Sequence, residues 1–152
     1  MRTIFWTIAI LFSLTSVSRG QSRRPDKYFI TQNYVGWILI QYEVKGAPRT
    51  PIKDGFNVYT LPRTGCVKTS SPRPQSGWAK DEYYYVSKTG AIKPLKRTGW
   101  GKGGTVWGGS ISDGTVTFDR NGKVIKKSPP TRTVFIGTEQ QFKKAGSRPH
   151  PK

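Results

Sequence analysis

Short runs of β-branched and aromatic residues, each ended by glycine, proline or an Asx-Gly pair, fill the chain from Tyr28 onward. Runs of this length, with apolar and polar residues alternating, are typical of half-buried strands rather than of amphipathic helices. Roughly seven such runs separated by frequent turns favour a single mainly-β domain. We therefore expect a single-domain antiparallel β-sandwich or a small barrel.

The longest run, residues 34–44, is apolar on both faces in its first half and on one face in its second half. This pattern predicts a central strand, because neighbours cover both faces of such a strand. Residues 91–95 contain Pro94, which cannot donate a ladder hydrogen bond, so this run is predicted to be an edge strand or no strand. Asn121-Gly122 predicts a tight hairpin. The other expected strands are residues 56–61, 82–87, 115–119, 123–126 and 133–137.

One short helix with residues 139–145 is predicted near the C-terminus. Thr138 can cap its first turn, and Gln141 stands where a capping box places its second member. Gly146 follows as a stop signal.

The N-terminus has the layout of a secretory signal. Arg2 precedes an apolar run at residues 4–14, and Ser18 and Gly20 supply the small residues before a cut at Gln21. The apolar run is too short to cross a membrane, which takes about 20 apolar residues. We expect a secreted or periplasmic product with no transmembrane segment after cleavage. The predicted organisation is a signal peptide at 1–20, a flexible basic leader at 21–27, an all-β domain at 28–145 and a disordered tail at 146–152.

Residues that could support catalysis are few. Cys66 is the one cysteine and His150 the one histidine, which excludes an internal disulfide and the multi-cysteine zinc sites. Asp81 and Glu82 are adjacent, so in a strand they point to opposite faces and do not form a catalytic pair. Cys66 fits either a small buried side chain or a thiol made reactive by basic neighbours. We predict no enzyme activity, no cofactor and no metal, with a hydrolase acting through Asp81 or Cys66 as the least favoured alternative.

The chain is strongly basic, with 26 Lys and Arg against 8 Asp and Glu and a formal net charge of +18. Such a field attracts polyanions in a salt-dependent way, and it also favours solubility with no ligand at all. Residues 99–104 match the letters of a dinucleotide-binding GxGxxG motif. The residues that follow are strand-like, where that motif needs a helix N-terminus, so we reject a dinucleotide site.

Two loops combine tryptophan with basic residues and form the candidate contact surface. They are residues 69–80 and the glycine-rich segment 99–109, which we expect to be a loop. Loops on a rigid sandwich commonly carry binding, and aromatic rings beside cationic groups can stack on bases or sugars. The alternative is that these rings fill a small core. The candidate binding residues are Arg73, Trp78, Lys80, Trp100, Lys102 and Trp107.

Several short motifs follow one another in a fixed order over about residues 30–142. They are Tyr34-Val35-Gly36-Trp37, Gly46-Ala47-Pro48, Thr69-Ser70-Ser71-Pro72, Asp81-Glu82-Tyr83-Tyr84-Tyr85, Trp107-Gly108-Gly109 and Phe135-Ile136-Gly137-Thr138-Glu139. The order resembles an uncharacterised family of small secreted bacterial domains. The resemblance implies an extracytoplasmic, mainly-β domain and carries no activity with it.

The sequence thus favours a non-enzymatic binding or accessory module of the cell envelope, with an anionic envelope polymer or a carbohydrate as its partner. The alternative is an electrostatic polyanion binder, for nucleic acid or another anionic polymer.

Overall fold

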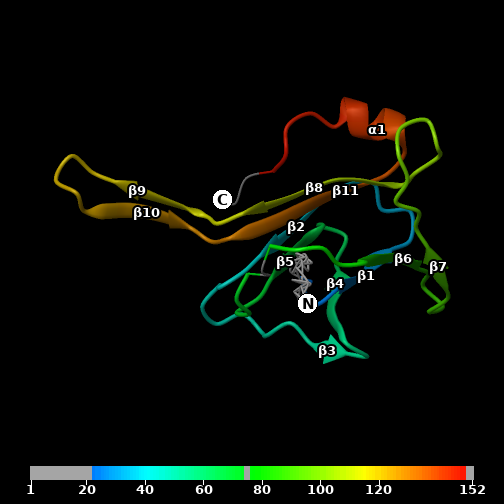
Figure 1. Ribbon diagram of the computed structural model, residues 1–152, viewed down its shortest axis with the longest axis horizontal. Coiled ribbons are helices and arrows are strands. Elements are labelled where there is room, and N and C mark those ends of the chain that lie inside the picture. Colours follow the sequence, from blue (N-terminus) through cyan, green and yellow to red (C-terminus); the bar gives the residue numbers. More distant parts are fainter. Residues whose placement is uncertain (1–21, 74–75, 150–152) are drawn as a thin grey trace, which may run out of the picture.

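Two β-sheets face each other across a shared core in the computed structural model, which describes residues 22–73 and 76–149 (Figure 1). The first sheet has the strand order β3 (Ile52–Lys53), β4 (Phe56–Leu61), β1 (Asp26–Thr31), β6 (Glu82–Val86) and β7 (Ile92–Pro94). The second has the order β5 (Cys66–Lys68), β2 (Gly36–Gln41), β11 (Thr131–Ile136) and β8 (Val106–Ser112). The predicted mainly-β sandwich is confirmed, and no closed barrel forms among the described residues.

The strand pairing is mixed, which corrects the prediction of antiparallel sheets. β1 runs parallel to both β4 and β6, and β2 runs parallel to β5. Parallel neighbours cannot be joined by a tight turn, so the chain passes from one sheet to the other between them. β2 lies between β5 and β11, as predicted for a central strand, and β7 lies at an edge, as Pro94 requires.

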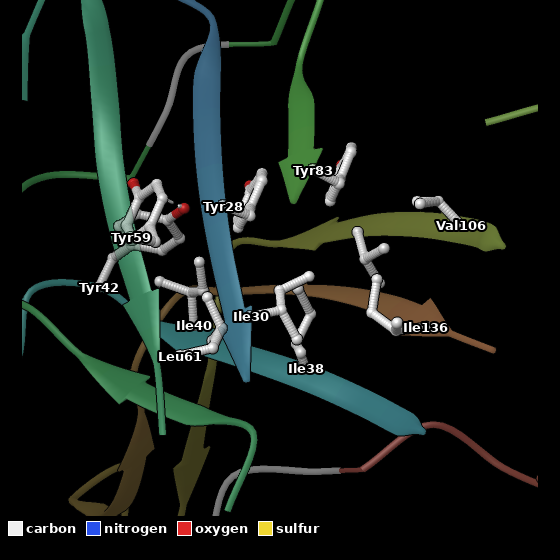
Figure 2. Packing of buried hydrophobic residues seen from close by; sticks show 11 residues of the cluster. Tyr28, Ile30, Ile38, Ile40, Tyr42, Tyr59, Leu61, Tyr83, Val106 and Ile136 are labelled. Carbon is white, nitrogen blue, oxygen red and sulfur yellow. Dashed lines mark hydrogen bonds between the residues drawn. The ribbon is translucent and has the colours of Figure 1, made fainter. Parts of the chain in front are cut away.

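The core between the sheets contains tyrosines as well as aliphatic residues (Figure 2). Tyr28 of β1 stacks between Tyr59 of β4 and Tyr83 of β6, with ring centroids 5.2 Å and 4.6 Å away. The three rings come from neighbouring strands, so the parallel pairing of β1 builds the stack. Stacked pairs of this kind contribute about 0.5–1.5 kcal/mol beyond their buried area. The other buried members of the core are Ile30, Ile38, Ile40, Tyr42, Leu61, Val106, Val134 and Ile136.

The other face of the second sheet is covered by α1 (Glu139–Lys144). Thr138 and Gln141 form the predicted capping box, in which each side chain accepts a hydrogen bond from the other residue's backbone N–H. Phe142 of α1 lies against Trp37 and Phe135, with ring centroids 5.7 Å and 5.4 Å apart. β11 is therefore buried on both faces.

β8 and β11 are continued by β9 (Thr115–Phe118) and β10 (Val124–Ser128), which form a hairpin that stands away from the sandwich (Figure 1). We call residues 114–130 the arm. The hairpin predicted from Asn121-Gly122 is confirmed, since β9 and β10 pair antiparallel on either side of it. Part of the glycine-rich segment 99–109 is strand rather than loop, because β8 begins at residue 106.

The segment predicted as a flexible leader is part of the fold from residue 22. Ser22 forms a β-bridge with Trp78, and β1 begins at Asp26. Residues 146–149 follow α1 outside the named helix and strands. The predictions for residues 1–21 and 150–152 lie outside the described residues. Within residues 22–73 and 76–149, no helix has the length and hydropathy that a membrane crossing needs.

Candidate functional site

Two buried carboxylates and two guanidinium groups join the start of β1 to the other sheet. We call Arg23, Asp26, Asp81 and Arg132 the ionic cluster. Arg23 Nη1 lies 3.2 Å from Asp26 Oδ2, and Arg23 Nη2 lies 2.6 Å from Asp81 Oδ2. Arg132 of β11 binds the same two carboxylates through its own Nη1 and Nη2. Each arginine therefore bridges both acids, and the cluster has no net charge.

Burial affects the two carboxyl groups differently. Burial raises the pKa of Asp26, and the charge of Arg132 and a hydrogen bond from Asn57 only partly oppose that rise. Burial also acts to raise the pKa of Asp81. There, the hydrogen bond from Arg23 and the charge of Arg132 outweigh it and hold the pKa below its ordinary value. Asp81 is thus an ionised anchor for both arginines and is not placed to act as a proton donor.

A groove of about 820 Å³ opens beside the ionic cluster. Its lining comes from both sheets and from the segments next to them. Arg23, Asp81 and Arg132 line its inner wall. The rest of the lining is provided by residues 77–80, 82–84, 94–95, 97 and 109–111. The size is that of a site for a small ligand or a short stretch of polymer.

The groove is lined by Arg97 and by Tyr83, whose hydroxyl is buried below the surface. The Tyr83 side chain is buried, and its hydroxyl has no hydrogen-bond partner among the described residues. Burial raises the pKa of Tyr83 to about 12, while the charges of Arg132 and Arg97 act to lower it. Arg97 forms no ion pair with a described residue, and a side chain added at Gly109 would meet its Nη2 at 3.4 Å. An anionic group in the groove would find the guanidinium donors of Arg97 there.

Of the residues predicted from sequence, Trp78 and Lys80 line the groove. Trp78 is 78% exposed at its rim. Arg73 lies elsewhere, in an ion pair with Asp113 close to the base of the arm. Lys102 lies on the exposed part of the glycine-rich segment. Arg73 and Lys102 therefore do not line the groove with Trp78 and Lys80.

Trp107 is buried, which corrects its assignment to a contact surface. Its Nε1 donates a hydrogen bond to the Gly137 carbonyl at 2.8 Å, and its ring stacks on Phe142 at 6.1 Å. Trp100 covers this cluster from outside, 5.1 Å from Trp107, and keeps more than half of its surface exposed. Trp107 therefore fills a buried aromatic cluster, which is the alternative considered for the tryptophans of these loops.

Tyr83, Arg97 and Arg132 complete the groove and are not among the residues predicted from sequence. Arg132 has a detectable signal, because a charged side chain within a strand of otherwise uncharged residues must be paired when that strand is buried. Tyr83 is one of three consecutive tyrosines, and strand alternation alone does not distinguish its role. Arg97 lies between β7 and β8, where no periodicity places its side chain.

Comparison with known proteins gives the family but no activity. The sequence matches a family of unknown function (DUF6843) over residues 22–140, and the chain belongs to this family. The uncharacterised family expected from the motifs is thereby confirmed. No curated protein matches the sequence. Among solved structures, the fold is similar to that of a "Putative Lipoprotein from Bacillus anthracis", with a TM-score of 0.57 and 22% identity over 85% of this chain and 82% of that chain.

Proposed function

We propose that this protein is a non-enzymatic binding domain of the bacterial cell envelope, and that the groove receives an anionic group of its ligand. The observation that carries the proposal is Arg97, which lines the groove together with Trp78 and Lys80 and forms no ion pair with a described residue. Arg132 keeps both Nη groups on the ionic cluster, which has no net charge, so Arg132 adds little to the attraction of an anion. Arg97 supplies the donors for a carboxylate or phosphate oxygen.

The rim of the groove fits a ligand that carries sugar or other flat apolar surface next to its charge. Trp78 is exposed there, with Lys80 two residues away. An aromatic face can stack on a sugar while a neighbouring lysine pairs with its anionic substituent. We therefore take an anionic polymer or carbohydrate of the envelope as the ligand class.

Two observations support the location. Residues 1–20 carry the features of a secretory signal, and the similar structure from Bacillus anthracis is named as a lipoprotein. We place the protein outside the cytoplasm, secreted or periplasmic, on this basis.

Binding of a heparin oligosaccharide, measured by calorimetry at several salt concentrations, tests the groove. Arg97→Gln should weaken binding by about 10–100-fold, because a hydrogen bond to a charged group is worth about 1.5–3 kcal/mol. Lys88→Gln removes the same charge from an exposed position outside the groove and should change binding by less than about 2-fold.

Tyr83→Phe is a second control, at a residue that lines the groove but has its hydroxyl buried. The substitution removes a hydroxyl that has no partner among the described residues, so it should leave the free energy of unfolding unchanged or raise it. Because the hydroxyl has almost no accessible surface, the same change should alter binding by less than about 2-fold. Unchanged binding in Arg97→Gln would exclude the groove.

The second candidate is polyanion binding through overall charge, which the formal net charge of +18 favours. In that case Arg97→Gln and Lys88→Gln would weaken binding equally. The logarithm of the binding constant would also fall steeply and linearly with the logarithm of salt concentration.

A further inference from the structure

The arm is a two-stranded hairpin that presents apolar side chains to solvent. β9 and β10 pair only with each other, and the hairpin stands away from the sandwich (Figure 1). Val116, Phe118 and Val124 are between 46% and 57% exposed. A hairpin of two strands is marginally stable by itself. Apolar side chains that stay in water add nothing to its stability, so their exposure points to another surface that buries them.

The strand register places these side chains on one face. Phe118 pairs with Val124, and Val116 pairs with Lys127. Because side chains alternate along a strand, the four residues share a face of the arm. The opposite face carries Thr115, Thr117, Lys126 and Ser128, and Ile125, which is 63% exposed, lies at the register shift between Val124 and Lys126. The arm is thus amphipathic, with a narrow apolar face that has a lysine at its base.

Basic residues surround this apolar face. Arg120 and Lys123 lie at the turn, and Lys126 and Lys127 lie on β10, against one acidic residue in the arm, Asp119. The Asp119 carboxylate is engaged in the turn itself, where Oδ1 accepts from the backbone N–H groups of Asn121 and Lys123 at 2.8 Å and 2.9 Å. The charge that the arm offers to a partner is therefore positive.

This combination selects the partner. A second copy of the chain would bring another strongly positive surface against the first, since the formal net charge is +18. An anionic bilayer surface complements both features, because apolar side chains enter the interface while lysine and arginine contact the headgroups.

We infer that the arm docks on an anionic lipid surface, with Val116, Phe118 and Val124 in the interface and Arg120, Lys123 and Lys127 against the headgroups. The inference is independent of the groove. It requires no membrane-crossing segment, because the arm lies on the bilayer.

Co-sedimentation of the full chain without its predicted signal with phosphatidylglycerol–phosphatidylcholine vesicles tests this inference. The protein should sediment with these vesicles and not with pure phosphatidylcholine vesicles. Phe118→Ser combined with Val124→Thr should reduce the bound fraction at least 5-fold. Ile92→Thr should leave it unchanged, because Ile92 is equally exposed (59%) but lies on β7. Circular dichroism of each variant checks that the sandwich remains folded.

A fluorophore sensitive to polarity, attached at Phe118→Cys in a Cys66→Ser background, reports the docking face directly. Its emission should shift to the blue with the anionic vesicles, whereas the same fluorophore at Ile92→Cys should not respond. Binding that needs only the lysines, or binding lost equally in the Ile92→Thr control, would overturn the inference. Equal sedimentation with neutral vesicles would overturn it as well.

Discussion

Arg132→Met removes one of the two cations of the ionic cluster and should strongly destabilise the fold. The Arg132 side chain is 8% exposed, and the carboxylates it contacts on Asp26 and Asp81 are 0% and 2% exposed. Methionine keeps most of the apolar contact with the Tyr28 ring, over which the guanidinium lies at 5.9 Å. The loss is then mainly that of an uncompensated buried charge, which costs about 3–5 kcal/mol.

Urea unfolding followed by tryptophan fluorescence measures this loss, since urea does not screen charge. The matched control is Arg73→Met, which breaks an ion pair in which the two side chains are 41% and 73% exposed. That variant should lose no more than about 1 kcal/mol. Equal losses for Arg132→Met and Arg73→Met would refute the reasoning.

A compensating variant distinguishes charge from packing. Adding Asp81→Asn to Arg132→Met leaves Arg23 facing Asp26 alone, so the buried charges balance again. The double variant should be more stable than Arg132→Met, although it departs further from the native side chains. If the double variant is the less stable of the two, packing rather than charge dominates the cluster.

Three further measurements follow. The stability difference between wild type and Asp81→Asn should persist above the ordinary carboxyl pKa of 3.8 and shrink as the pH falls through the lowered pKa of the folded protein; urea unfolding from about pH 7 to about pH 2 measures it, and a difference that grows on acidification would contradict it. Trp107→Ala should cost about 3–5 kcal/mol and Trp78→Ala less than about 0.5 kcal/mol in thermal unfolding, since only the first ring is buried; similar losses would show that the burial is wrongly assigned. Gly65→Ala should destabilise the fold more than Gly90→Ala in the same assay, although both glycines have positive φ. At Gly65 a Cβ would come within 1.9 Å of a tyrosine hydroxyl and 2.8 Å of a backbone carbonyl, whereas at Gly90 it would meet nothing within 4 Å. The reverse order of stability would contradict this geometry.

Local signals in the sequence predict local structure well in this chain. Asn121-Gly122 predicts the hairpin of the arm because a tight turn depends on its own residues. Thr138 and Gln141 predict the start of α1 because a capping box spans four consecutive residues. The two-faced apolar run that contains β2 predicts a central strand, because burial on both faces leaves its mark within the strand.

The groove depends on contacts that no local pattern contains. Arg132 contacts Asp26 across 106 residues, and Arg23 contacts Asp81 across 58. Whether a tryptophan is exposed depends on the strand face it occupies. Next to Trp107, the alternation of side chains between the two faces is interrupted by the positive φ of Gly108 and by a shift in the β8–β11 register. Trp78 and Lys80 could be selected from composition, whereas their partners on β6 and β11 come only from the sheet order.

The parallel pairing of β1 also sets the order in which the chain can fold. Asp26 pairs with Asn57, 31 residues later, and also contacts Asp81, 55 residues later. β1 is therefore the first strand of its sheet along the chain, but its pairing is complete only when β4 and β6 have joined it. Non-local pairing of this kind folds over about milliseconds to seconds. The arm, whose strands are joined by a short turn, can form on its own much earlier. A chain shortened past Thr31 at its N-terminus would lose the strand on which β4 and β6 assemble.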